Sequence, residues 1–165
     1  MTEKTEKMLG NKCLLAVRIR GTVSAKREAR ETLEMLHLIR NNYAVLVDDR
    51  PSFVGMLQAA RNYITWGEIS KEAVTALMLK RARLVGNRKI PDEYFQKTGN
   101  KSMAELAEKI FNRELEYWHL PNIQRVFKLR PPTKGYKGNV KKGYGTGGEA
   151  GYRGDKINEL IKRMI

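Results

Sequence analysis

The sequence predicts an α+β fold: a small three-stranded sheet with two packed helices, plus a helical insert and a basic extended loop. Within residues 1–64, two segments with alternating apolar residues are each followed by an apolar stripe at helical spacing. Residues 125–153 differ in composition, because they are basic and glycine-rich and contain few residues that build a core. The chain has 165 residues, which is long enough to bury one sizeable core.

The first strand is predicted over residues 13–20, where apolar residues recur at every second position. We expect one face of this strand to lie on the core and the opposite face to be basic, carrying Arg18 and Arg20. Gly21 ends the strand, and Ser24 is predicted to cap the N-terminus of the following helix. The core-facing residues of this strand and helix are predicted to be Leu15, Val17, Ile19, Ala25, Ala29, Leu33 and Leu36.

A second strand and helix follow at once. Asn41 and Asn42 are predicted to form a turn, and residues 43–47 alternate again as a strand. Pro51 suits the first turn of the next helix, because its φ angle is already helical there. The apolar face of that helix is predicted to contain Phe53, Met56, Leu57, Ala60, Tyr63 and Ile64. Residues 1–64 thus form the predicted α/β core.

The remainder of the chain is predicted to form two further parts. Residues 65–120 show helical patterns only, so they are interpreted as a helical insertion, with Ser102 and Glu105 forming a capping box. Residues 121–165 contain the third strand at 125–130, then the basic glycine-rich extension and a C-terminal helix. The apolar stripe of this last helix is predicted to be Ile157, Leu160, Ile161 and Met164.

The basic extension is the most informative segment for function. Between Lys128 and Gly148 it contains no acidic residue, and its glycines alternate with lysines and tyrosines. Such a segment buries too little apolar area to offset its ordering entropy, so alone we expect it to be mobile. Lysines that reach phosphates and tyrosines that stack on bases would make it an RNA-binding element. A solvated linker is the alternative interpretation.

The net charge of +14 extends this argument to the whole chain. A charge of this size destabilises a compact isolated protein, and nucleic acid is the commonest polyanion that compensates for it. An anionic membrane surface is the second candidate, although no apolar run reaches the length of a spanning helix. The single cysteine and the absence of a signal peptide favour a cytoplasmic location.

Patterns typical of enzymes are sparse. The two histidines and one cysteine show no spacing typical of a zinc site, and we expect no metal and no cofactor. Gly143, Gly145 and Gly148 match G-x-G-x-x-G, but neither an apolar strand nor a helix flanks them as a dinucleotide site requires. Asp48 and Asp49 are interpreted as turn and helix-start charges, with a metal-ligand role as the alternative. His37 is interpreted as a partly buried residue at a helix end.

Residues 32–64 resemble the signature region of the L-thirty family of large-subunit ribosomal proteins, called L-seven in eukaryotes. Tyr43 departs from the family pattern, which usually has a small polar residue or histidine at that position. The segments 64–70 and 128–138 resemble the longer archaeal and eukaryotic form, and the absence of a long basic N-terminal extension favours the archaeal type. The residues that carry the resemblance are Thr32, Leu33, Leu36, Leu38, Arg40, Val45, Met56, Leu57, Ala60, Tyr63 and Ile64.

The resemblance implies a structural, non-catalytic rRNA-binding protein with a fold related to split βαβ. Its implied partners are large-subunit rRNA, with 5S rRNA as a further candidate, and other large-subunit ribosomal proteins, without a membrane or a small-molecule substrate. Two sets of RNA contacts are predicted. The set on the core comprises Arg18, Arg20, Lys26, Arg27, Arg30, Arg40, Asn41 and Asn42. The set on the extension comprises Lys128, Arg130, Lys134, Tyr136, Lys137, Lys141, Lys142, Tyr144 and Arg153.

Two other functions remain open from the sequence. A free-standing RNA chaperone or general nucleic-acid-binding protein would explain the charge alone. A nucleotide-dependent enzyme would explain the glycine motif, and a thermal shift with NAD or ATP would detect it.

Overall fold

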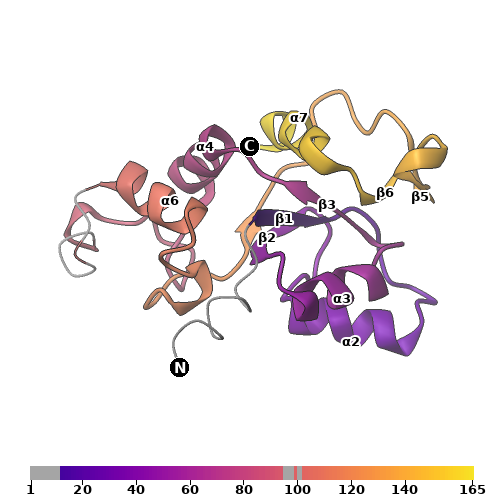
Figure 1. The fold of residues 1–165 in the computed structure, drawn as a ribbon, viewed down its shortest axis with the longest axis horizontal. Helices are drawn as coiled ribbons and strands as arrows, with labels where there is room; N and C mark the ends of the chain where they lie inside the picture. The colour runs from indigo at the N-terminus through magenta and orange to yellow at the C-terminus, as the bar shows by residue number, and fades with distance from the viewer. Residues whose placement is uncertain (1–11, 95–98, 100–101) are drawn as a thin grey trace.

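The structure of the chain is a computed structural model that describes residues 12–94, 99 and 102–165. The first eleven residues of the predicted core, and the start of the chain used to judge a signal peptide, lie outside the described residues. The described residues form a mixed sheet with helices on both sides, which confirms the α+β class (Figure 1). None of the described helices is long and apolar enough to cross a membrane.

The centre of the sheet is a split βαβ arrangement, as the resemblance implies. Strand β1 (Cys13–Arg18) pairs antiparallel with β2 (Tyr43–Asp48) on one side and with β3 (Ile64–Glu68) on the other. Strands β2 and β3 are therefore parallel to each other, and helix α3 (Pro51–Ala59) connects them. Among the described residues the strand order is β4-β2-β1-β3-β6-β5.

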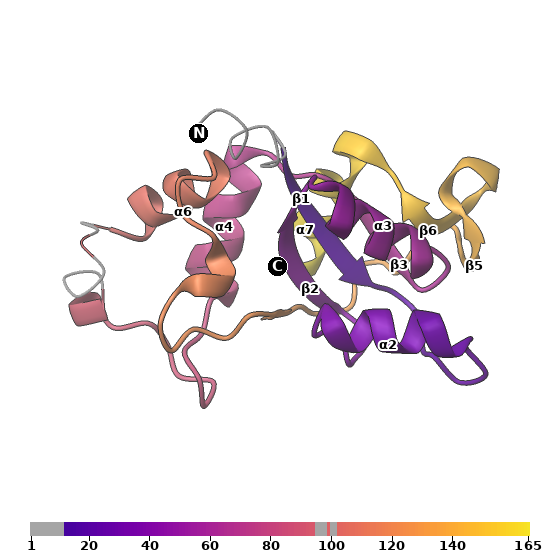
Figure 2. The same ribbon diagram turned by 60° about the horizontal axis from the view of Figure 1, so that its bottom comes forward.

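Helices cover both faces of this sheet. Helices α2 (Arg27–Met35) and α3 pack on one face, where Leu14 and Ala16 of β1 join their core cluster. Leu15 and Val17 point to the opposite face, toward α4 (Lys71–Arg81), α6 (Met103–Phe111) and α7 (Ile157–Met164). Figure 2 shows α4 and α6 side by side, apart from α2 and α3. The predicted basic face of the first strand is therefore wrong, because the whole strand is buried.

The third strand of the central sheet is not the one predicted. Residues 64–68 continue the apolar pattern of α3 and were expected to be helical, but they form β3. The predicted strand at 125–130 is reduced to β4 (Phe127–Lys128), which pairs with Tyr43 and Ala44 at the edge of the sheet. The insert at 65–120 thus does not hold helical patterns only, and its predicted boundary falls inside β3. The division into residues 1–64, 65–120 and 121–165 stays a prediction.

Helix α2 differs from the prediction at its N-terminus and agrees with it at its C-terminus. Its N-cap is Lys26 without a side-chain cap bond, and Ser24 instead adopts a positive φ of 62° in the preceding turn. At the C-terminus, His37 has a φ of 58° and its N–H bonds to the Glu34 carbonyl, while the Leu38 N–H bonds to the Leu33 carbonyl. These two bonds form a Schellman motif, which confirms His37 as a partly buried helix-end residue.

The second half of the basic extension is folded. Strand β5 (Asn139–Gly143), the 3-10 helix η2 (Tyr144–Thr146) and β6 (Gly148–Tyr152) follow one another, and β6 pairs parallel with β3. A Cβ at Gly148 would lie 2.0 Å from the Lys142 carbonyl oxygen, so only glycine permits this approach of the two backbones. The 3-10 helices η1 (Tyr117–His119) and η3 (Gly154–Lys156) precede β4 and α7. This extension therefore adds strands to the sheet beyond the three that were predicted.

Replacing Leu33 with alanine is expected to lower the free energy of unfolding by roughly 2–5 kcal/mol. Leu33 is 2% exposed in the cluster between α2, α3 and the sheet, so the substitution leaves a cavity. Urea denaturation followed by circular dichroism measures the change, with Met35→Ala as a control because Met35 is 58% exposed on the same helix. Equal stabilities of the two variants would contradict this packing of α2.

Candidate nucleic-acid interface

Most of the RNA contacts predicted on the α/β core lie on the surface of the protein. Lys26, Arg27 and Arg30 are exposed at the start of α2, and Arg40 is exposed in the turn before β2. Arg27 forms an exposed ion pair with Glu31 at 2.6 Å, one turn further along the helix. An exposed pair of this kind contributes little to stability, so the guanidinium stays free to exchange Glu31 for a phosphate. This end of α2 therefore offers three cations to a polyanion.

Two predicted RNA contacts point into the protein instead. Arg18 is 7% exposed and donates from NH1 to the carbonyl oxygens of Leu38 at 2.8 Å and Ile39 at 2.5 Å. Arg153 is 8% exposed, with its NH2 bonded to the Glu149 carboxylate and its Nε bonded to Thr65 Oγ1 at 2.7 Å. Both guanidiniums are thus occupied internally. Arg18 holds the turn after α2, and Arg153 holds β6 against β3.

A hydrogen bond connects the two predicted sets of contacts. The Tyr136 hydroxyl lies 3.2 Å from Asn42 Oδ1, which it bonds as a donor. Burial raises the pKa of Tyr136 to about 12, so the hydroxyl keeps its proton at neutral pH. The backbone of Asn42 also accepts from the Leu129 N–H at 3.0 Å. The turn at residues 40–42 and the start of the basic extension therefore form one continuous surface.

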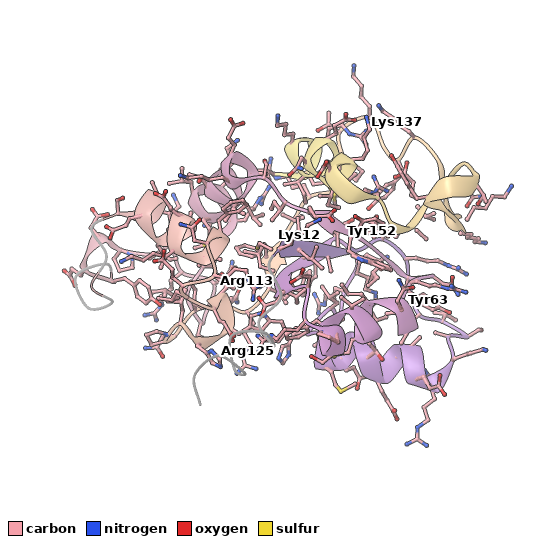
Figure 3. The ribbon with its side chains drawn as sticks, in the orientation of Figure 1. Lys12, Tyr63, Arg113, Arg125, Lys137 and Tyr152 are labelled. Atoms are coloured by element: carbon pink, nitrogen blue, oxygen red, sulfur yellow. The ribbon has the colours of Figure 1, made fainter. Side chains whose placement is uncertain are left out.

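The lysines of the extension are exposed and unpaired within the described part of the chain. Lys134, Lys137, Lys141 and Lys142 form no ion pair with any described residue. Figure 3 labels Lys137 on the segment that leads into β5. Among them Tyr144 is 36% exposed, and the Arg153 guanidinium carbon lies 4.7 Å from the centre of its ring. One ring face is therefore held by a buried cation from the protein itself.

A second aromatic residue positions one of the RNA contacts predicted on the α/β core. The guanidinium of Arg20 lies 5.5 Å from the centre of the Tyr63 ring, and both residues are half-buried. Stacking on the ring fixes a long side chain that would otherwise lose rotamer entropy on binding. Arg20 is thus held in place at the end of β1.

The acidic pair Asp48–Asp49 takes part in ion pairs. Asp48 pairs with Arg50 and, at 3.3 Å, with Arg113, while Asp49 lies 3.6 Å from Arg113. Figure 3 shows Arg113 between the helices of the insert and the sheet. Within the described residues, no group of three or more histidine, cysteine or acidic side chains could hold a metal ion. These acids therefore connect the insert to β2.

Comparisons with known proteins decide the family. A sequence model of the family described as ribosomal protein L30p/L7e matches residues 14–64. The large ribosomal subunit protein uL30 of Methanopyrus kandleri is 44% identical over 149 residues, which cover 89% of this chain and 100% of that protein. This chain belongs to the L30p/L7e family. The uL30 protein of Ignicoccus hospitalis is 44% identical over 95% of this chain and 100% of its own length, and that of Thermofilum pendens is 40% identical over 92% and 97%.

The L30p/L7e match at residues 14–64 runs from β1 to the start of β3, so it covers the split βαβ unit. It contains Arg20, Arg40 and the α2 cations but ends before the basic extension. The uL30 relatives, in contrast, cover most of the chain, extension included. The resemblance predicted from residues 32–64 is thereby confirmed.

Sequence reasoning missed one basic group on this L30p/L7e chain. Arg81 and Arg83, at the end of α4, lie beside Lys128 and line a small cleft with it. The available signal was the run at residues 80–89, which contains five lysines and arginines and no acidic residue. The periodicity of apolar residues assigns these cations to a helix end, where cations are common. It gives no sign that they lie close to β4 in the folded protein.

Proposed function

We propose that this protein is a structural constituent of the large ribosomal subunit, in the cytoplasm, where it binds rRNA and stabilises the folded RNA during translation. Membership of the L30p/L7e family supports the proposal, as do uL30 relatives that align with it over their full length. A protein of this family acts structurally, in agreement with the prediction of no enzymatic activity. Other large-subunit proteins are its further proposed partners.

We assign the rRNA contacts to the exposed and half-exposed members of the two predicted sets, which we call the basic surface. Arg18 and Arg153 are left out, because their guanidiniums bond within the protein and act by positioning the turn and β6. Phosphate contacts should dominate, since RNA in a folded particle is recognised largely by shape. The basic surface comprises Arg20, Lys26, Arg27, Arg30, Arg40, Asn41, Asn42, Lys128, Arg130, Lys134, Tyr136, Lys137, Lys141, Lys142 and Tyr144.

The hydrogen bond between Tyr136 and Asn42 is the observation that carries this assignment. It joins residues that are 94 positions apart in the sequence, so the cations of the core and those of the extension lie on connected parts of the surface. A linker would have no reason to be fixed to the core in this way. The ordered extension therefore favours an RNA interface over the linker interpretation.

Sedimentation of tagged protein in cell lysate tests the proposed function. We expect the protein to co-migrate with large subunits on a sucrose gradient. We also expect it to stay bound after a high-salt wash, because an extension that runs between RNA segments of the assembled particle is held by the particle's packing as well as by charge. A tagged cytoplasmic protein of similar size and charge serves as the control for non-specific adsorption. Recovery of the protein in light fractions at both salt concentrations would reject the ribosomal assignment.

A free-standing RNA chaperone is the second candidate function, and the charge of +14 alone supports it. Ultraviolet crosslinking separates the two functions. A ribosomal component should crosslink to a few fixed rRNA positions, whereas a chaperone should crosslink to a dispersed population of RNAs.

A further inference from the structure

A small cationic cleft places Arg81 and Arg83, which were not among the contacts predicted from the sequence, beside Lys128, which was. It has a volume of about 180 Å³ and opens where the end of α4 meets β4. Arg130 lies close enough to Arg81 to act on its charge, so it belongs to the same group of cations. The residues that line the cationic cleft are Arg81, Arg83, Asn87, Gln124 and Lys128.

The charges of the cationic cleft are uncompensated within the described chain. No acidic residue lines it, and Arg81, Arg83, Lys128 and Arg130 form no ion pair with a described residue. The Nε atom of Arg81 is buried and has no hydrogen-bond partner among the described residues. Desolvation, followed by the charges of Arg130 and Arg83, lowers the pKa of Arg81. The free protein therefore holds like charges together at a cost in stability.

The helix macrodipole explains only part of this arrangement. Cations in the last turn of α4 interact favourably with its C-terminus, which accounts for Lys80 and Arg81. Arg83 lies beyond the end of the helix, and Lys128 and Arg130 come from a segment more than forty residues away. Their convergence on one cleft needs a further cause, and an anion that binds in the cleft supplies it.

The backbone around the cleft is fixed in advance. Leu84 forms an isolated antiparallel bridge with Ile123, and the Gln124 N–H donates to the Arg83 carbonyl at 2.8 Å. The Val85 N–H donates to the Asn122 carbonyl at 2.8 Å. The two segments that carry the cations are thus held side by side before any ligand arrives. Such preorganisation reduces the entropy lost when the side chains close on an anion.

From this geometry we propose that the cationic cleft binds the phosphodiester backbone of RNA, with Arg81 and Arg83 as phosphate ligands contributed by the insert. The proposal rests on the proposed function, because it takes rRNA as the source of the phosphate. Asn87 and Gln124 add amide donors and acceptors that suit ribose hydroxyls. Leu129, between Lys128 and Arg130, bonds to Asn42 of the basic surface, so one RNA segment can run from that surface into the cleft.

A charge-matched pair of double variants tests the cleft in the full-length protein. Arg81→Gln with Arg83→Gln removes two cleft cations, whereas Lys80→Gln with Lys89→Gln removes two exposed cations of the same segment that do not line the cleft. Binding to purified large-subunit rRNA is measured by filter retention between about 0.1 and 0.5 M KCl. We expect roughly ten- to thirtyfold weaker binding at 0.1 M, and a log-log salt slope lower by about 1.4, for the arginine variant alone.

Thermal unfolding of the free variants separates binding from folding. Relief of repulsion should leave the melting temperature of the arginine variant equal to or above that of the wild type, while a structural role would lower it. Should this variant fail to fold, Arg81→Lys with Arg83→Lys keeps the charges but loses the planar fork, and it is expected to bind more weakly than the wild type.

The results distinguish the failure of this inference from the failure of the proposed function. If the wild-type protein does not bind large-subunit rRNA, the proposed function fails. If it binds, and the two double variants lose equal affinity, charge alone matters and the cleft is not a phosphate site. If the arginine variant binds RNA normally but loses crosslinks to a neighbouring ribosomal protein, the cleft holds an acidic protein segment, and the RNA assignment is overturned.

Discussion

Replacing Arg153 with methionine is expected to lower the free energy of unfolding by roughly 3–5 kcal/mol at pH 7. Glu149, which is 4% exposed, would be left as a buried carboxylate without its cationic partner. The substitution also removes the bond from Arg153 Nε to Thr65 Oγ1, which connects β6 to β3. The other carboxylate oxygen of Glu149 accepts from the Gly138 N–H at 2.8 Å, so the loss extends to the start of β5.

The pH dependence of this loss identifies its cause. Hydrogen bonds from Arg153 and Gly138 outweigh the desolvation of Glu149, and they lower its pKa from the ordinary value of 4.5. A carboxyl with a depressed pKa in the folded state stabilises the protein above about pH 4.5, and this stabilisation is lost as the pH falls through the folded-state value. The difference between the wild type and the Arg153→Met variant should therefore be largest at pH 7 and shrink below pH 4.5.

Urea denaturation at pH 7 and at pH 4 measures this difference. The double variant Glu149→Leu with Arg153→Met is the matched control, because it replaces the whole buried pair with apolar side chains and should recover much of the lost stability. A single variant as stable as the wild type at pH 7 would show that β6 does not depend on this pair, and that the extension is not packed on the sheet as described.

The regular spacing of apolar residues predicted the helices and strands that bury one apolar face. Strands β1 and β2, helices α2 and α3 and the C-terminal helix all follow from apolar residues at regular spacing. Strand β3 was missed because Tyr63 and Ile64 continue the helical stripe of α3 and conceal its end at Ala59. A short apolar run does not distinguish a helix from a buried strand, and only the pairing with β1 does so.

The fold of the extension depends on contacts that residue preferences do not report. Strands β5 and β6 contain few β-branched or aromatic residues, so composition indicates a loop. The segment that follows β6 packs on the sheet through close approach of backbones: a Cβ at Gly67 of β3 would lie 2.0 Å from the carbonyl oxygen of Gly154 in η3. Such approaches join residues that are distant in the sequence, and a pattern along the chain does not contain them.

The structure shows which of the predicted contact residues are accessible on the surface and which are buried. An arginine at an alternating position was assigned to an open face, but α2, α3 and the turn after α2 close that face over Arg18. Arg153 is buried for a related reason, since β6 becomes an inner strand between β3 and β5. Arg81 and Arg83 were missed because their nearness to β4 is a product of the tertiary fold. The net charge thus predicted RNA as the class of ligand, and the structure determines which lysines and arginines are exposed to bind it.

Replacing Lys134, Lys137, Lys141 and Lys142 with alanine is expected to weaken binding to large-subunit rRNA roughly a thousandfold at 0.1 M salt. Each lysine that neutralises a phosphate releases about 0.7 to 0.9 counterions, so the log-log salt slope should fall by about 3 to 4. The affinities of the variant and the wild type should converge near 1 M salt, where counterion release no longer favours binding. All four lysines are exposed and form no ion pair with a described residue, so the stability of the fold should change little.

Filter retention over a range of KCl concentrations measures the slope, and thermal unfolding checks the fold. Replacement of the same four lysines with arginine is the control: it keeps the charge, so we expect the wild-type slope. An unchanged slope in the alanine variant would mean that the extension spans the subunit without holding RNA, as a linker does. A reduced slope with unchanged melting would show that these lysines act on the RNA, because their exposed ammonium groups contribute nothing to the packing of β5 and β6 against the sheet.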